Sequence, residues 1–387
     1  MMRKIRTALV FGPNGGQSLD YGGAAYVTLL IANTLSQMAS SVFVVAARGL
    51  SRDRLERVHG VRLEKSVRLL YANQFIERKM LSAISLSSRI LVNTVRSCFD
   101  RRGVELVIFG DDAPKQLVPF FRKKGSVIIN YAHLPLFVRA SYPRIGYWCY
   151  EHSLLVPAAL LYWKNEFANP SEYDLNIANS SVTSDLLKAV GVKNVRILHP
   201  PARRYIGKLT AKLPIILHAA QYGKGFDRKL AVSILKESQR RRIPFKWVFL
   251  RGSSAPNAIK RMARKMDNVN LYDFLPDDMY SKILSEASVI LNLRYLEPFG
   301  ISTVEAMSAG AIPAILRSRF NGSWLDVCAK NNVGLGIEDP IVFVDWLEKL
   351  QEENFRGSCS ELALSISNAF VPTKFTSGLI NIIDSIV

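Results

Sequence analysis

Closely spaced cysteines are lacking in this sequence. Its four cysteines, Cys98, Cys149, Cys328 and Cys359, lie far apart and form no C-x-x-C pair. A disulfide framework or a structural zinc site needs regularly spaced cysteines, so neither is indicated, and this usage is typical of a reducing cytosol. No cluster of histidines and carboxylates has metal-ligand spacing either, and no metal site is expected.

Long uninterrupted apolar runs are lacking as well. Residues 145–163 are rich in aromatics and leucine, but Glu151, His152 and Pro157 interrupt them. Because a membrane-spanning helix needs about 20 nearly uncharged apolar residues, this segment is expected to be a buried helix or a helix in the membrane interface. The apolar stretch Ala8–Phe11 is too short for a signal peptide and is interpreted as a first strand.

Negative charge is scarce relative to positive charge. The 387 residues include 51 Lys and Arg against 32 Asp and Glu, a formal net charge of +19. Such an excess predicts an anionic partner, which composition leaves open among nucleic acid, an acidic membrane surface and phosphorylated ligands; a solvated basic surface is the alternative. Zinc-finger spacing, an RNP-like aromatic strand, Gly-rich dinucleotide loops and P-loops are all absent. No nucleic-acid partner is therefore expected.

Apolar runs bounded by turn residues alternate with helical patterns along the chain. This alternation is typical of βαβ units and parallel sheets, and the length suffices for two domains. The strands of a first series are expected at Thr7–Phe11, Val42–Ala46, Leu106–Phe109, Ser126–Asn130 and Leu175–Ala178. Those of a second series are expected at Ile215–Ala219, Lys246–Leu250, Val269–Tyr272, Val289–Leu293 and Ile312–Ile315. The predicted fold class is α/β, with two doubly wound Rossmann-like domains.

The boundary between the two domains is expected at a Pro-Pro break. His199-Pro200-Pro201 follows a strand and stiffens the chain. We therefore expect an N-terminal domain at residues 1–199, a C-terminal domain at 200–371 and a terminal helix at 372–387. Ligands of doubly wound sheets bind outside the carboxyl ends of the strands, so the active site is expected in a cleft between two facing sheets.

The most informative segment runs from Leu293 to Gly310. An apolar strand ends in a loop that contains Glu297 and Gly300, and a helix is expected from about Ser302 to Gly310. The first N–H groups of a helix and the positive end of its dipole attract anions. Residues 299–303 are therefore predicted to bind a diphosphate.

Two carboxylates flank this helix start. A carboxylate can accept hydrogen bonds from two adjacent hydroxyl groups of a sugar, which makes Glu297 and Glu305 candidate ligand-binding residues. Glu305 is expected in the first helical turn, where Ser302-x-x-Glu305 also matches a capping box. The residues alone leave ligand binding and helix capping both open for Glu305.

The segment Glu297–Gly310 resembles the E-x7-E signature of glycosyltransferase family 4, a family of retaining GT-B enzymes. The resemblance implies that Glu297 contacts hydroxyl groups of the donor sugar and that Glu305 binds the ribose of the nucleotide. It also implies transfer without a metal or another cofactor, the nucleotide-sugar being the donor substrate. It further implies that the backbone of Phe299, Gly300 and Ile301 contacts the sugar and the phosphates.

Other fragments match the family in the same order along the chain. Asp20-Tyr-Gly22-Gly23 is similar to its Gly-Gly loop beside the donor phosphates, although Asn14-Gly15-Gly16 is a rival and a plain strand-to-helix turn also explains the glycines. Asn130–Pro135 resembles the His-Tyr-Pro segment of the mannosyltransferases that act on dolichol-linked oligosaccharides. This resemblance implies that His133 lies near the donor sugar, while a structural histidine is the alternative.

The chain departs from the family in the loop after the first strand of the second domain. There the family has an Arg and, a few residues on, a Lys, which neutralise the diphosphate leaving group. Lys224 matches the Lys, but Ala219, Ala220 or Gln221 occupies the position of the Arg. Losing this cation removes several kcal/mol of transition-state stabilisation unless another side chain replaces it. The candidate replacements are Arg228, Lys229, Arg251 and Arg294.

Together these features predict a retaining glycosyltransferase that moves a hexose, with mannose a candidate, from a GDP- or UDP-linked donor to a glycan or lipid-linked saccharide. Glu297, His133 and Lys224 are the expected catalytic residues. The resemblance implies that the terminal helix returns to an acceptor-side N-terminal domain. Positive charge and the aromatic residues of 145–163 predict a cytoplasmic protein held peripherally at the anionic cytosolic face of a membrane. The alternative is a catalytically impaired sugar-nucleotide-binding or scaffold subunit of a glycosylation complex.

Overall fold

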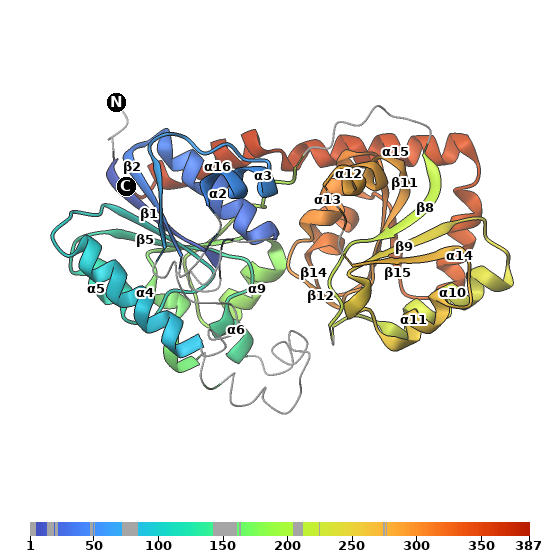
Figure 1. Cartoon of the computed structure of the whole chain (residues 1–387), viewed down its shortest axis with the longest axis horizontal. Coiled ribbons are helices and arrows are strands. Elements are labelled where there is room, and N and C mark those ends of the chain that lie inside the picture. The colour runs from blue at the N-terminus through green and yellow to red at the C-terminus, as the bar shows by residue number, and fades with distance from the viewer. Residues whose placement is uncertain are drawn as a thin grey trace. The chain divides into compact units, whose positions relative to one another are not determined.

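The computed structural model describes most of the chain, which divides into two compact units (Figure 1). The first unit comprises Met1–Gly146, His152–Pro200 and Thr373–Val387, and the second comprises Tyr147–Glu151 and Pro201–Pro372. Each unit is built on a parallel sheet of its own. The residues that the structure describes are 5–13, 19, 22–46, 49, 51–71, 84–141, 161, 164–203, 212–223, 225–273, 275 and 277–387.

The sheet of the first unit has seven parallel strands. Their spatial order is β3 (Val67–Tyr71), β2 (Ala39–Ala46), β1 (Ile5–Phe11), β4 (Leu106–Gly110), β5 (Val127–Ala132), β6 (Leu175–Ala178) and β7 (Val195–Ile197). Ala8 of β1 lies opposite both Val42 of β2 and Leu106 of β4. The order reverses between β1 and β4, which is the switch point of a doubly wound sheet.

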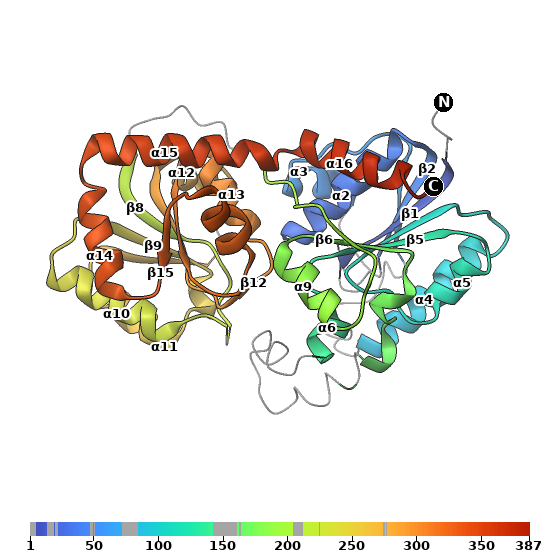
Figure 2. The same cartoon turned by 180° about the vertical axis from the view of Figure 1, so that it is seen from behind.

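Helices cover both faces of this first sheet (Figures 1 and 2). They are α2 (Gly23–Ser36), α3 (Arg52–His59), α4 (Ile84–Phe99), α5 (Leu117–Arg122), α6 (Leu136–Ser141), α9 (Ser181–Ala189) and α16 (Pro372–Asp384). α4 and α5 pack on one face, where the rings of Phe11 and Phe109 stack at 4.5 Å. α2 and the terminal helix α16 lie side by side on the other face, joined by the hydroxyl groups of Thr34 and Thr376 at 3.1 Å.

The sheet of the second unit has six parallel strands and the same winding. Their order is β10 (Val269–Tyr272), β9 (Lys246–Leu250), β8 (Leu213–His218), β11 (Ala287–Asn292), β13 (Ile312–Leu316) and β15 (Leu335–Ile337). The order reverses between β8 and β11, so these two strands form the switch point. A separate two-stranded sheet pairs β12 (Leu296–Glu297) with β14 (Phe320–Asn321).

Helices also cover both faces of the second sheet. They are α10 (Arg228–Arg240), α11 (Asn257–Ala263), α12 (Asp277–Glu286), α13 (Ile301–Ser308), α14 (Pro340–Lys349) and α15 (Glu353–Ser367), with a π-helical turn at Ser323–Ala329. α10, α11 and α14 pack over Trp247 and Phe249 on one face. α12 and α13 pack over Leu217 and Ile290 on the other, and α15 lies against α13 (Figure 2).

The predicted α/β class with two doubly wound parallel sheets is confirmed. Three strands of the two large sheets, β3, β7 and β15, were not predicted, and each is an edge strand. The two-residue strands β12 and β14 were not predicted either. An edge strand has one neighbour and keeps part of its surface in water, so it lacks the continuous apolar run of an interior parallel strand. Residues 145–160 and 162–163 of the predicted aromatic segment lie outside the described residues. Among the helices that the structure describes, none is long and apolar enough to cross a membrane.

Candidate functional site

The carboxyl ends of β8 and β11 form the switch point of the second sheet. β8 ends at His218 and β11 at Asn292, and the two strands pair with Leu217 opposite Ile290. Ligands of doubly wound sheets bind in the crevice outside the carboxyl ends of the strands at such a point. The loops after these two strands are therefore the part of the second unit where a ligand is expected.

The loop after β11 is tied to the loop after β8. Arg294 forms an antiparallel bridge with Phe226. The backbone N–H of Tyr295 donates to the carbonyl oxygen of Gly225 at 2.7 Å, and the Tyr295 hydroxyl donates to Oδ2 of Asp227 at 2.5 Å. These contacts hold Arg294 against the loop in which the resemblance expects a diphosphate-binding pair of cations. Lys224, the predicted member of that pair, lies outside the described residues.

Arg294 and Glu297 form an ion pair within the β11–α13 loop. Nη1 of Arg294 lies 2.9 Å from Oε2 of Glu297, and only 18% and 14% of the two side chains are exposed. Asn321 fixes the loop from β14, since its Nδ2 donates to the carbonyl oxygen of Arg294 at 2.8 Å. A carboxylate has about four acceptor positions, so one ion pair leaves Glu297 able to accept hydrogen bonds from sugar hydroxyl groups.

Helix α13 begins directly after this loop. Gly300 is its N-cap, with a φ of 81° that favours glycine, and no side chain in the described part of the chain caps the helix. The first N–H groups, at Ile301 and Ser302, have no partner within the helix and form the positive end of its dipole. The side chain of Phe299 is 1% exposed and belongs to the core. This helix start therefore offers backbone groups, rather than side chains, to an anion.

The capping-box interpretation of Glu305 is wrong. α13 begins at Ile301 and has no acidic residue in its first turn, so Glu305 lies one turn further along. It is 3% exposed, and its Oε1 accepts a hydrogen bond from Nε of Arg203 at 2.8 Å. Burial raises the pKa of Glu305, and the charge of Arg203 opposes that shift. Arg203, which the sequence analysis did not single out, is thus the partner of this buried carboxylate.

Buried polar atoms without a hydrogen-bond partner gather around this helix start and the switch point. Within the described residues they include the hydroxyl groups of Tyr222 and Thr303, Nδ2 of Asn292, Nε of Arg294 and both ring nitrogens of His218. An unpaired buried donor or acceptor costs about 1–3 kcal/mol. Several such groups in one place indicate a region organised to bind a polar ligand.

His218 is a neutral histidine at the end of β8. It is 1% exposed, and its ring lies 5.1 Å from that of Tyr222 and 5.2 Å from that of Phe226. Burial and the nearby charge of Arg294 lower the pKa of His218 to about 3. Near neutral pH its ring therefore has one donor and one acceptor nitrogen. His218 was not predicted as a site residue from the sequence, although a polar residue that ends an apolar strand was the available signal.

In the first unit, His133 lies at the carboxyl edge of the sheet, directly after β5. Oδ1 of Asp111 accepts hydrogen bonds from the N–H groups of His133 and Leu134 at 2.5 and 2.8 Å. Nδ1 of His133 lies 3.4 Å from Nδ2 of Asn179, which follows β6. Burial lowers the pKa of His133, although Asp111 opposes the shift. A fixed, neutral imidazole suits both a ligand contact and a structural role, so the role of His133 stays a prediction.

The predicted Gly-Gly loop of the first unit lies at the start of α2. Gly22 is the N-cap, with a φ of 100°, and Gly23 is the first helical residue. Among the residues that the structure describes, no atom lies within 4 Å of a Cβ placed at Gly22. Asp20 and the rival Asn14-Gly15-Gly16 lie outside the described residues. The donor-phosphate role of Gly22 and Gly23 therefore stays a prediction.

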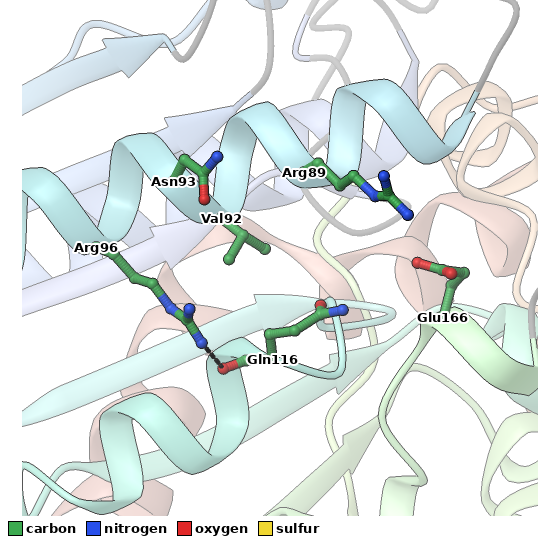
Figure 3. Close-up of a pocket in the computed structure, with 6 residues that line it drawn as sticks. All are labelled: Arg89, Val92, Asn93, Arg96, Gln116 and Glu166. Carbon is green, nitrogen blue, oxygen red and sulfur yellow. Dashed lines mark hydrogen bonds between the residues drawn. The ribbon is translucent and has the colours of Figure 1, made fainter.

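A separate pocket lies beside α4 in the first unit (Figure 3). Nη2 of Arg96 lies 3.5 Å from the carbonyl oxygen of Gln116 across it. Its lining residues are Arg89, Val92, Asn93, Arg96, Gln116 and Glu166, none of which was predicted as a site residue. Within the part of the chain that the structure describes, no group of three or more His, Cys, Asp or Glu side chains could hold a metal ion.

Solved structures match this chain along nearly its whole length. No protein-family model matches it, and no curated protein sequence is significantly similar. HepE from Anabaena, in complex with UDP and glucose, is 13% identical, with 98% of this chain and 100% of that chain covered and a TM-score of 0.65. WaaG, a glycosyltransferase involved in lipopolysaccharide biosynthesis, is 14% identical, with 97% of this chain and 99% of that chain covered and a TM-score of 0.69. Sucrose-phosphate synthase from Thermosynechococcus elongatus is also 14% identical, with 98% of each chain covered and a TM-score of 0.67. At such low identity the similarity establishes the fold, and the chain therefore has the GT-B fold of two Rossmann-like domains.

Proposed function

We propose that this chain is a nucleotide-sugar-dependent glycosyltransferase whose donor site is the β8–β11 switch point of the second unit. The observation that carries the proposal is the group of buried polar atoms, without a partner among the described residues, at the switch point and the α13 start beside the Arg294–Glu297 pair. A helix start suits a diphosphate, and a carboxylate with spare acceptor positions suits sugar hydroxyl groups. The UDP and glucose bound by HepE support the same class of donor.

The proposed reaction exchanges one bond at C1 of the donor sugar. The bond between C1 and the distal phosphate oxygen breaks, and its electron pair stays on that oxygen as the nucleoside diphosphate leaves. The hydroxyl oxygen of the acceptor bonds to C1, and its proton passes to the departing phosphate oxygen. Negative charge develops on the diphosphate, so the start of α13 stabilises the transition state. Glu297 orients the sugar, and Glu305 accepts hydrogen bonds from the ribose.

The finer assignments rest on the resemblance to glycosyltransferase family 4. We propose a retaining enzyme of that family that transfers a hexose, with mannose a candidate, without a metal or another cofactor. His133 is proposed to contact the donor sugar and Lys224 the diphosphate, with Gly22 and Gly23 near the donor phosphates. Each of these roles can be tested separately, with a variant of one residue at a time.

A panel of donors tests the proposed function. We expect UDP-glucose, UDP-N-acetylglucosamine or GDP-mannose to raise the unfolding temperature, since a ligand at 100 times its Kd stabilises the folded state by about 2.7 kcal/mol. Glu297→Ala should lower sugar transfer about 100-fold or more. In Glu297→Ala the matching nucleoside diphosphate, which has no sugar, should still raise the unfolding temperature as it does in the wild type. Differential scanning fluorimetry and donor turnover measure the two effects, with the replacement of Glu361, an exposed residue of α15, by alanine as the control.

Two results would count against catalysis. If neither a donor nor a nucleoside diphosphate shifts the unfolding temperature, the proposed donor site is wrong. If donors bind but the wild-type chain transfers no sugar, the chain is better described as a sugar-nucleotide-binding or scaffold subunit.

We also propose that the acceptor is a lipid-linked saccharide at the anionic cytosolic face of a membrane. In this proposal residues 1–199 serve the acceptor, 200–371 hold the donor, and 372–387 return to the first domain. The net charge of +19 supports attraction to acidic lipid. The chain should float with phosphatidylserine vesicles at low salt and dissociate from them at about 1 M salt, where charges are screened. It should not bind neutral phosphatidylcholine vesicles. Failure to float with acidic vesicles at low salt would refute the membrane role.

A further inference from the structure

The loop after β8 lacks the arginine that the resemblance expects for the diphosphate. Residues 219–223 are Ala-Ala-Gln-Tyr-Gly and carry no charge. As the C1–O bond of the donor breaks, the electron pair moves onto the diphosphate, and each donor aimed at such developing charge is worth about 10²–10³-fold in rate. If the proposed function is right, a cation from another part of the site has to take that place.

Arg294 reaches this place from the neighbouring strand. Its backbone bridge to Phe226 sets it against the end of the loop after β8, and it precedes Glu297 in the loop that leads to α13. Because β8 and β11 form the switch point, this is also where a ligand of the second sheet is expected. The position of Arg294 thus joins the diphosphate-binding helix start to the sugar-binding carboxylate.

The guanidinium of Arg294 has donors to spare. Nη1 binds Glu297, while Nε is buried and has no hydrogen-bond partner among the described residues. A guanidinium carries five N–H donors in a planar fork, and its other edge can bind phosphate oxygens in the bidentate manner typical of arginine. We infer that Arg294 is the second diphosphate-binding cation of the site, holding Glu297 with one edge and the leaving group with the other.

Arg251 supports this assignment. It follows β9, the strand next to β8, and has a φ of 58°. Such a backbone conformation is uncommon for a residue other than glycine and tends to persist at functional sites. Partial desolvation and then the charge of Arg294 lower the pKa of Arg251. Two guanidinium groups whose charges interact repel each other, and an anion that binds both would relieve the repulsion.

The other candidate cations fit less well. Arg228 and Lys229 are exposed residues in the first turn of α10. An exposed cation is hydrated and screened by salt, so it stabilises a leaving group far less than a partly buried one. Arg294 is therefore the candidate that combines burial, an unpaired donor and the switch-point position.

The test compares nucleoside diphosphates with monophosphates. We would measure the Kd values of UDP, UMP, GDP, GMP, ADP and AMP by isothermal titration calorimetry, for wild type and for Arg294→Met. Arg294→Met should weaken binding of the preferred diphosphate about 10- to 100-fold, the value of a charged hydrogen bond. Its effect on the matching monophosphate should stay within about 3-fold, because the contact is to the distal phosphate. Arg261→Met, which removes an exposed charge from α11, is the control.

Further variants keep the inference testable if Arg294→Met unfolds. Arg294→Lys keeps the charge without the fork and should give an intermediate preference for the diphosphate, while Arg251→Met should weaken diphosphate binding by less than Arg294→Met does. An unchanged diphosphate-to-monophosphate ratio in folded Arg294 variants overturns the inference and leaves the proposed function standing. The inference is also overturned if Arg228→Met, rather than Arg294→Met, weakens binding of the diphosphate. If wild type binds none of the three diphosphates, the proposed function fails and the inference fails with it.

Discussion

Replacement of Arg203 by alanine should lower the free energy of unfolding of the second unit by about 3 kcal/mol at pH 7. This is the lower end of the effect of removing one partner from a buried ion pair, because the Arg203 side chain is 33% exposed. The Glu305 side chain is only 4% exposed and depends on the guanidinium 2.8 Å away. Without Arg203, the carboxylate is left in the core beside Val304 and Met307, where an unpaired charge is poorly solvated. Donor affinity should fall as well, since Glu305 is the proposed ribose-binding residue.

The loss should depend on pH in a definite direction. Burial already raises the pKa of Glu305 in the folded state, and removing the opposing charge of Arg203 should raise it further. A carboxyl group whose folded pKa exceeds its unfolded pKa destabilises the fold as the pH rises from the unfolded value, near 4.5, toward the folded one. The difference in stability between wild type and Arg203→Ala should therefore be small near pH 4.5 and grow toward pH 7.

Urea unfolding at pH 5 and pH 7, followed by tryptophan fluorescence, measures this difference. Glu305→Gln combined with Arg203→Ala should lose less at pH 7 than Arg203→Ala alone, because no charge remains buried. Lys282→Ala is the matched control, since its ion pair with Glu286 at 3.9 Å leaves the Lys282 side chain 73% exposed. An exposed pair of this kind is worth about 0–1 kcal/mol. Equal losses for Lys282→Ala and Arg203→Ala would show that burial of Glu305 has no role.

The sequence predicts the interior of both sheets because their strands have a strong local pattern. β4 and β13 are buried at every position, and such parallel strands form continuous apolar runs. The helix α13 was predicted within two residues because Gly300 and Gly310 mark its ends, each with a positive φ. In both cases the information lies within one short segment.

The rest of the site depends on contacts between distant segments. Arg203 and Glu305 are 102 residues apart, and the bridge between Arg294 and Phe226 joins two loops whose neighbourhood follows from the pairing of β8 with β11. No spacing rule links such residues, because their proximity is created by the winding of the sheet. Arg294 could be named as one of several candidate cations, but only the fold distinguishes it from Arg228.

Replacement of Gly300 by alanine should destabilise the second unit by about 2–5 kcal/mol, the sum of a left-handed backbone penalty and overpacking. With a φ of 81°, Gly300 has a conformation that costs an L-residue about 1–2 kcal/mol. A Cβ at this position would also run into the Ser323 side chain, whose hydroxyl donates to the carbonyl oxygen of Phe299 at 2.7 Å. Because Ser323 is fully buried, it has no free space into which to move.

Gly60→Ala separates the two contributions. Gly60 also has a left-handed φ, 63°, but a Cβ there meets no atom of the described part of the chain within 4 Å, so this variant should lose only the backbone contribution. Adding Ser323→Ala to Gly300→Ala should restore some stability by removing the overlapping hydroxyl. Urea unfolding measures these values. Titration with the nucleoside diphosphate that the wild-type chain prefers should show that Gly300→Ala weakens its binding about 10-fold or more, because displacing the start of α13 removes the N–H groups proposed to hold the diphosphate. If Gly60→Ala and Gly300→Ala lose the same stability and binding of the preferred nucleoside diphosphate is unchanged, the tight packing of the helix start against Ser323 does not position the donor site.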